Sequence, residues 1–275
     1  MLKQLSMLAL GLLAGALIGP PAASAQAGAA ELTLRRFDCG NDVTPRDIAR
    51  WSDAFAYEGQ KRHFTFSCYL VRHGDEYLIW DTGFVPGSNP SAPNASLTDQ
   101  LAQLGLAPDR IKYVGISHYH GDHTGQVSQF PNATLLIGKG DWEAITAPKP
   151  APGVNFPPFE HWIHGGGKVE PVPLDKDVFG DGTVIMLATP GHTPGHHSLL
   201  VKLKEKGAVI LSGDAAHFHE NYDSDGVPSF NTSRAETVAS LERLKNIAAR
   251  LNATVVLQHD TRDVDKLPAF PAEAR

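Results

Sequence analysis

The chain has 275 residues, 42% of them hydrophobic, which is enough to bury a sizeable core. Its 24 basic and 30 acidic residues give a formal net charge of −6, and no cluster of Lys and Arg occurs. This distribution argues against a nucleic acid as partner, because phosphate backbones are bound by clustered cations. The 13 histidines, most of them beyond residue 117, need a separate explanation.

The N-terminus has the pattern of a secretory signal peptide. One lysine precedes an apolar run from Leu5 to Ile18, and Ala23-Ser24-Ala25 matches a small-residue cleavage site. The run is shorter than the roughly 17 residues that span a bilayer, so stable membrane insertion is not expected. We predict a signal peptide over residues 1–25, a single domain over residues 26–275, and a mature protein that is periplasmic or secreted.

Two cysteines are present, Cys39 and Cys68. An oxidising compartment would permit a disulfide between them, and two separate thiols are the alternative. The sequence leaves both interpretations open.

The predicted elements alternate between strands and helices along the chain. The first strand is expected over residues 31–39, and a β-hairpin over residues 63–72 and 76–83. Further strands are expected at 111–117, 133–139, 183–189, 196–203, 208–214 and 253–260. Helical spacing of apolar residues predicts helices at 96–106 and 234–251, and the Pro-rich segment 147–159 is expected to be a loop.

Both halves of the chain place strands before polar motifs and share an order of strands followed by a helix. This order predicts an α/β protein in which two sheets pack face to face with helices outside.

The segment SHYHGDHTG, residues 117–125, gathers metal-binding residue types directly after a predicted strand. His118 and His120 are two residues apart and can leave an extended segment on the same side, while Asp122 and His123 follow one turn later. One loop could thus serve two metal ions, which lie roughly 3.5–4 Å apart in paired hydrolytic sites. Neutral imidazole and carboxylate suit a borderline cation such as zinc. The alternative is a surface loop that binds metal adventitiously.

Three other predicted strands also end in a residue that can bind metal. His192 lies in a Gly/Pro turn after one strand, Asp214 ends a second, and His259 ends a third. Four such strand ends make coincidence a poor explanation, and a built metal centre is the better one.

These residues resemble the seven-ligand, dinuclear form of the metallo-β-lactamase superfamily. The resemblance implies an αββα sandwich, with two mixed β-sheets, helices on their outer faces and the site at one edge. It implies two divalent metal ions, expected to be Zn²⁺, and a catalytic role for a bridging hydroxide. The ligands would be His118, His120 and His192 for one ion, Asp122, His123 and His259 for the other, and Asp214 for both. Asp122 is also a candidate proton shuttle.

Within that superfamily the chain most resembles the N-acyl homoserine lactonases. The similarity extends to Gly213-Asp214-Ala215, to Glu220-Asn221, and to the short segment that follows His259. It implies opening of the lactone ring of acylated homoserine lactones, small-molecule signals, and hence quorum quenching. Family members commonly carry a tyrosine three residues after the bridging aspartate, where this chain has His217. We expect the imidazole of His217 to take over a hydrogen bond to the substrate. The alternatives are that it marks a different substrate or is a surface histidine beside His219.

Two other functions within the same fold stay open. One is a hydrolase of esters, thioesters or β-lactams. The other is a mono-iron persulfide dioxygenase, in which only His118, His192 and Asp214 would hold the metal.

An acyl chain would need an apolar wall. Aromatic residues in or near the Pro-rich loop and after Asp214 are candidates, with anchoring of these segments to the core as the alternative: Phe156, Phe159, Trp162, Phe218 and Tyr222. The sequence leaves the oligomeric state open, a homodimer included.

Overall fold

The structure is a computed structural model that describes residues 30–150 and 153–275. The predicted signal peptide lies outside the described residues. Among the helices that are described, none combines the length and the apolar character needed to cross a bilayer.

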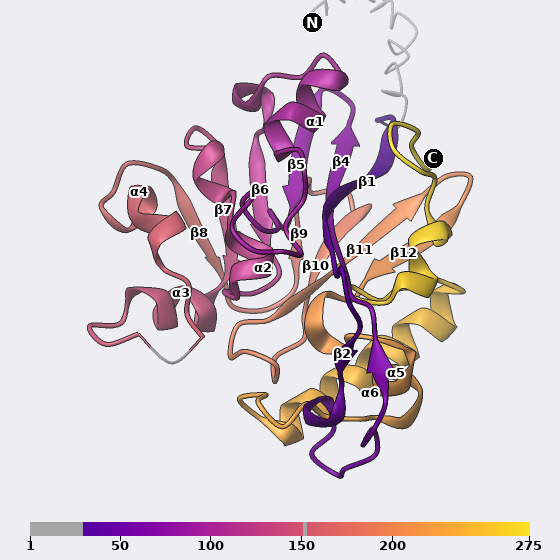
Figure 1. Ribbon diagram of the computed structural model, residues 1–275. Coiled ribbons are helices and arrows are strands. Elements are labelled where there is room, and N and C mark those ends of the chain that lie inside the picture. The colour runs from indigo at the N-terminus through magenta and orange to yellow at the C-terminus, as the bar shows by residue number, and fades with distance from the viewer. Residues whose placement is uncertain (1–29, 151–152) are drawn as a thin grey trace, which may run out of the picture.

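Six strands form the first sheet, in the order β1-β4-β5-β6-β7-β8 (Figure 1). Their bounds are β1 (Leu32–Asn41), β4 (Thr65–His73), β5 (Glu76–Trp80), β6 (Tyr113–Ile116), β7 (Thr134–Gly138) and β8 (Val169–Val172). The pairs β1·β4 and β4·β5 are antiparallel, whereas β5 to β8 pair in parallel, so the sheet is mixed.

The second sheet has five strands in the order β13-β12-β11-β10-β9. Their bounds are β9 (Lys176–Asp177), β10 (Val184–Ala188), β11 (His197–Leu203), β12 (Gly207–Leu211) and β13 (Thr254–Val256). Only β12 and β13 pair in parallel. A separate two-stranded ribbon joins β2 (Arg46–Asp47) to β3 (Lys61–Arg62).

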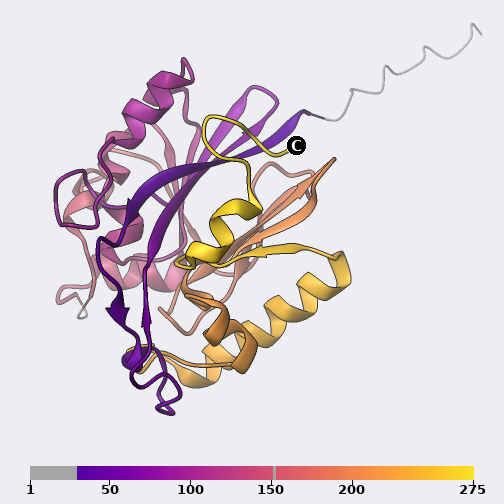
Figure 2. The same cartoon turned by 45° about the vertical axis from the view of Figure 1, so that its right-hand side comes forward.

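Helices cover the outer faces of both sheets. Their bounds are α1 (Leu97–Gln103), α2 (Gly121–Thr124), α3 (Lys139–Thr146), α4 (Glu160–Ile163), α5 (His219–Ser224) and α6 (Arg234–Leu251). Helices α3 and α4 lie beside β7 and β8, and α6 runs along the outside of the second sheet (Figures 1 and 2).

Strand alternation explains this layering. In β4, Tyr69 and Val71 belong to the core between the two sheets, together with Met186 and Val201 of the second sheet. Their neighbours in β4 point to the opposite face, where Leu70 packs with side chains of the covering helices. Residues 65–71 of β4 are all buried, as expected for a strand that is covered on both faces. The predicted αββα sandwich is confirmed.

A disulfide joins Cys39 to Cys68 and so crosslinks β1 to β4. Both residues are fully buried. The structure thus decides between the two interpretations of these cysteines. Gly83 lies against the bridge, with a backbone φ of +58° that favours glycine.

Candidate metal centre

The predicted ligands follow the ends of four strands. His118 and its neighbours follow β6 in the first sheet, while His192, Asp214 and His259 follow β10, β12 and β13 in the second. Because β10 and β12 both run antiparallel to β11, and β13 runs parallel to β12, these three strands end at the same edge. The edge meets β6 through a hydrogen bond of 2.9 Å from the His197 N–H to the Ser117 carbonyl.

The first set of donors lies around one oxygen of Asp214. The Nδ1 atom of His120 is 2.9 Å from Nε2 of His118 and 3.0 Å from Nε2 of His192. Asp214 Oδ2 is 3.6 Å from Nε2 of His118 and 3.3 Å from Nε2 of His192.

The second set lies around the other oxygen of the same carboxylate. Asp214 Oδ1 is 3.3 Å from Nε2 of His123 and 3.0 Å from Nε2 of His259. Asp122 Oδ2 is 3.6 Å from each of these two nitrogens. The structure therefore brings all seven predicted ligands together, with one set of nitrogens facing each oxygen of Asp214. His217 also lies close enough to form a third possible group with Asp214 and His259.

The chemistry of these groups fits divalent metal ions. Within the described part of the chain, His123 Nε2 and Asp214 Oδ1 are buried and have no hydrogen-bond partner, a costly state that a bound cation would relieve. Burial lowers the pKa of His118 and of His192 well below the usual value, so both imidazoles are neutral, which is the form that binds metal. The set of imidazole and carboxylate donors suits zinc.

Hydrogen bonds at the far side of the rings orient three of the histidines. His123 Nδ1 lies 2.8 Å from Asp81 Oδ2, and His192 Nδ1 lies 2.8 Å from Asn231 Oδ1. His259 Nδ1 donates to the carbonyl of Thr65 at 3.0 Å. Each contact leaves Nε2 facing Asp214. Hydrogen bonds at the other ring nitrogen commonly orient metal-binding histidines in this way.

Two further buried residues hold the ligand loops in place and were not predicted from the sequence. Asp141, at the start of α3, accepts hydrogen bonds from Tyr119 N (3.2 Å), Thr193 Oγ1 (2.8 Å) and Gly195 N (2.6 Å). It thereby ties the loop of His118 and His120 to the loop of His192.

The second of these residues is His196. Its Nε2 accepts from the backbone N–H of Asp214 at 2.9 Å, and its Nδ1 lies 2.9 Å from Thr189 Oγ1. The sequence shows His196 in the Gly/Pro turn that also carries His192, but it does not show that its partner is Asp214, 18 residues away.

His217, predicted to contact the substrate, lies next to the shared carboxylate. Its Nε2 is 3.2 Å from Asp214 Oδ2, and its buried Nδ1 has no hydrogen-bond partner among the described atoms. Burial lowers its pKa from the usual value. Trp51 and Phe230 meet the ring edge-on, with centroids 6.0 Å away in both cases.

A pocket of about 140 Å³ opens onto the centre. Besides metal-donor residues and His217, it is lined by four aromatic residues and one cation: Trp51, Phe64, Phe66, Phe230 and Arg46. Most of these lie on or near β2 and β4, far from the motifs in the sequence.

This lining differs from the predicted substrate wall, because none of the five predicted aromatic residues belongs to it. Phe159, Trp162 and Phe218 are buried in the core on the outer side of the first sheet. Phe156 is 42% exposed but lies outside the pocket lining, and Tyr222 packs against the cluster under α6. The burial of Phe159, Trp162 and Phe218 matches the alternative of anchoring residues, and contact of the five side chains with substrate stays a prediction.

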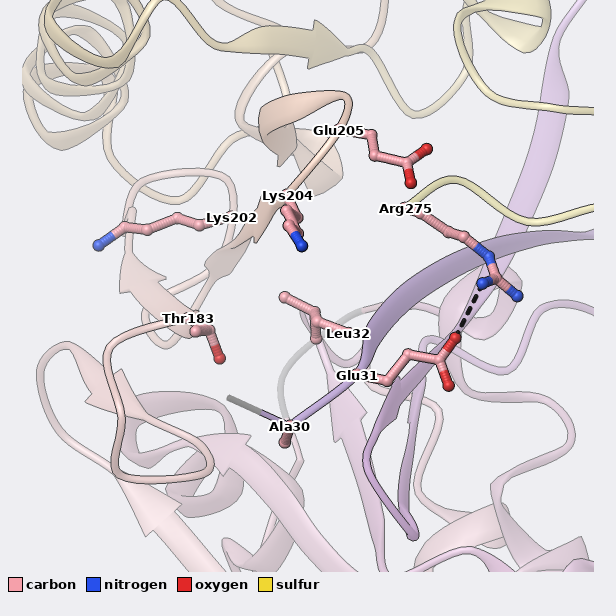
Figure 3. A pocket seen from close by; sticks show the side chains of 8 residues that line it. All are labelled: Ala30, Glu31, Leu32, Thr183, Lys202, Lys204, Glu205 and Arg275. Atoms are coloured by element: carbon pink, nitrogen blue, oxygen red, sulfur yellow. Dashed lines mark ion pairs between the residues drawn. The ribbon is translucent and has the colours of Figure 1, made fainter. Parts of the chain in front are cut away.

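A separate hollow of about 520 Å³ lies between the start of β1 and the β11–β12 hairpin (Figure 3). Its charges are mixed, since Lys202, Lys204 and Glu205 line it together with Glu31 and Arg275, which pair at 2.9 Å. None of the residues lining it belongs to the donor sets, so it is not part of the metal centre.

Comparison with known proteins agrees with this geometry. The model of the metallo-beta-lactamase superfamily matches residues 66–259. The chain is also 36% identical, over 193 residues, to the N-acyl homoserine lactonase AttM of Rhizobium radiobacter, an alignment that covers 63% of this chain and 68% of the relative. The chain belongs to the N-acyl homoserine lactonase family of the metallo-β-lactamase superfamily. The predicted resemblance is confirmed, and the chain is a metal-dependent hydrolase.

Other members of the superfamily show the same likeness. AttM of Rhizobium johnstonii is 34% identical over 224 residues, which cover 70% of this chain and 80% of that relative. Among solved structures, an N-acyl homoserine lactone hydrolase with the product N-hexanoyl-L-homoserine bound at its catalytic metal centre has a TM-score of 0.75 at 23% identity. That match covers 90% of this chain and all of the other, and it supports the fold.

Proposed function

We propose that the protein opens the lactone ring of N-acyl homoserine lactones with a pair of divalent metal ions, and that these are zinc. The observation that carries the proposal is the Asp214 carboxylate, whose two oxygens face two separate sets of nitrogen donors at 3.0–3.6 Å. The names of the relatives support the substrate class. All seven donors lie together, which favours a two-metal hydrolase over a mono-iron dioxygenase that would use three of them.

The two sets of donors found in the structure would each hold one metal ion. His118, His120 and His192 would hold one ion, Asp122, His123 and His259 the other, and Asp214 both. When bound, such a pair polarises a carbonyl group and lowers the pKa of water, so that hydrolysis needs no serine or cysteine nucleophile.

Asp122 is placed to move a proton. Its side chain lines the pocket and is 23% exposed, whereas that of Asp214, which also lines the pocket, is 4% exposed. A carboxylate oxygen of Asp122 can accept a proton from the attacking water and return it to the alkoxide oxygen that leaves when the ring opens. His217 lines the same pocket, and its imidazole can hydrogen-bond a substrate oxygen and so fix the orientation of the ring.

A substrate panel on purified, zinc-loaded protein tests this proposal. It would contain acyl homoserine lactones, simple lactones, thioesters, β-lactams, and a persulfide with measurement of oxygen uptake. We expect turnover of acyl homoserine lactones, two zinc ions per chain, complete loss of activity on chelation, and recovery when zinc is restored. One iron per chain with oxygen consumption, or full turnover in Asp214→Ala, would contradict it.

We also propose that the protein is exported and cleaved after Ala25. The signal-peptide pattern and the disulfide between Cys39 and Cys68 support an oxidising destination. Cell fractionation followed by N-terminal sequencing should find a mature chain that begins at Gln26 outside the cytoplasm. A chain that keeps its first 25 residues in the cytoplasm would refute it.

A further inference from the structure

Among the residues that the structure describes, Arg46 is the only lysine or arginine that lines the pocket of the metal centre. It also lines a second, outer hollow of about 530 Å³, together with Val43, Phe84 and Pro90. The residue therefore lies where the two spaces meet. The aromatic surface continues in the same direction, because Phe66 of the inner pocket packs on Phe84 of the outer hollow with centroids 4.8 Å apart.

The guanidinium group of Arg46 is held in a fixed position. Its Nε and Nη2 donate to the two oxygens of Asp42 at 2.7 and 2.5 Å. Asp42 is itself fixed, since it accepts from Ser91 Oγ at 2.8 Å and from the backbone N–H of Phe64 at 3.2 Å, and its side chain is only 2% exposed. The guanidinium carbon lies 5.3 Å from the ring centre of Phe64 and 5.6 Å from that of Phe66.

One nitrogen of this group is still available. Within the described part of the chain, Nη1 of Arg46 makes no hydrogen bond, and the side chain is 41% exposed. Asp42 neutralises the charge of Arg46, and Asp122 lines the same pocket. Nη1 is therefore better suited to a neutral carbonyl oxygen than to an anion.

The size of the inner pocket indicates which carbonyl this is. A volume of about 140 Å³ is below the usual range of ligand pockets and accommodates a small ring, so that a longer substituent must leave through the mouth. An acylated homoserine lactone carries an amide directly on its ring. With the ring at the metal centre, that amide lies at the mouth and the acyl tail extends over the outer hollow.

We propose that Arg46 Nη1 donates a hydrogen bond to the amide carbonyl of the substrate, and that this contact makes the site select lactones with an acylamino substituent. The inference rests on the proposed lactonase function and adds a residue that determines specificity.

The test compares two substrates, N-hexanoyl homoserine lactone and γ-butyrolactone, which has the ring without the amide. In Arg46→Met we expect kcat/KM for the acylated lactone to fall about 10- to 100-fold, the effect of losing one charge-assisted hydrogen bond, chiefly through KM. The value for γ-butyrolactone should change less than about twofold, because that substrate never makes the contact.

Two further variants keep the test decisive. Arg46→Lys keeps a cation beside the buried Asp42, so it folds even if Arg46→Met does not, and it should show a smaller loss confined to the acylated substrate. Arg50→Met is the matched control: Arg50 lies 4.5 Å over the ring of Phe230 but does not line the pocket, and its removal should leave the ratio of the two substrates unchanged.

The outcomes separate this inference from the proposed function. Wild-type protein that hydrolyses the acylated lactone, with Arg46 variants that lose activity equally on both substrates or on neither, would overturn the inference alone. Wild-type protein inactive on acylated lactones would overturn both.

Discussion

His217 is the residue beside Asp214 for which we predict a contact with substrate instead of metal. Its Nε2 is 3.2 Å from Asp214 Oδ2 and its ring lines the pocket. We expect His217→Ala to lower kcat about 10- to 100-fold, since one hydrogen bond to the substrate is lost, while two zinc ions remain bound.

The neighbouring His219 provides the control. It pairs with Asp263 at 2.8 Å and does not line the pocket, so His219→Ala should keep the wild-type kcat. Metal content measured by atomic emission decides the role of His217: loss of one zinc in His217→Ala would make it a ligand instead.

Asp141 determines part of the pH dependence of stability. Burial raises its pKa to about 7, from an ordinary value of 3.8, although its three hydrogen bonds act in the opposite direction. The native chain thus keeps a proton that the unfolded chain releases between about pH 4 and pH 7. The stability that this proton contributes is complete below about pH 4 and is lost as the pH rises through 7.

Urea unfolding of the chelated protein measures this effect. The difference in unfolding free energy between wild type and Asp141→Ala should shrink as the pH rises from about 4 to 7 and stay constant above that. A difference that stays constant or grows over this range would show that the native carboxylate is already ionised there. Weaker zinc binding by Asp141→Ala, measured by competition with a chelator, would support its role in holding the two ligand loops.

At the scale of elements, the contact between α3 and the loop that carries His192 depends on glycine. A Cβ atom on Gly195 would meet the backbone and side chain of Asp141, and one on Gly138 would meet the carbonyl of Gly195. We expect Gly195→Ala to lower the unfolding free energy by about 1–3 kcal/mol, as overpacking does, and to weaken zinc binding, because the loop must move. Thr146→Ala, at the exposed end of α3, should change neither quantity, as equilibrium unfolding and chelator competition would show.

The prediction of elements from sequence worked where the apolar pattern is strong. Helix α6 spans the predicted residues 234–251, and the hairpin β4–β5 appears where it was expected. The predicted strand over residues 253–260 ends at Val256, because the chain then turns so that His259 reaches Thr65. The ribbon β2–β3 was not predicted, since strands of two residues leave no periodic signal.

The site was predictable to a similar extent. Ligand residues can be recognised from the sequence by their residue type and by their position at the end of a strand, which places them at an edge of the sheet. The residues that line the pocket cannot be recognised in this way, because Trp51, Phe64 and Phe66 look like ordinary core residues and reach the centre only through the tertiary fold. Asp141 is likewise far in sequence from the three groups that donate to it. Arg46 is four residues from Asp42 but far in sequence from the metal-binding motifs whose pocket it lines.

At the scale of the whole molecule, the disulfide joins two long strands of the first sheet. The double variant Cys39→Ala/Cys68→Ala should lose about 3 kcal/mol of unfolding free energy, as expected for a bridge that closes a loop across 29 residues of separation. Denaturant unfolding checks this value. Zinc content should stay at the wild-type level, because neither cysteine lies in the donor sets; a large loss of zinc would show that the bridge also supports the centre.

Each donor set draws on both halves of the sandwich. His118 and His120 come from the first sheet and His192 from the second, and His123 and His259 are divided in the same way. Bound ions would therefore crosslink the two halves. Because the ions bind the folded protein, its resistance to heat and to proteases would rise with the free zinc concentration. If the protein is exported as proposed, scarcity of zinc outside the cell would shorten the lifetime of the protein as well as lower its turnover.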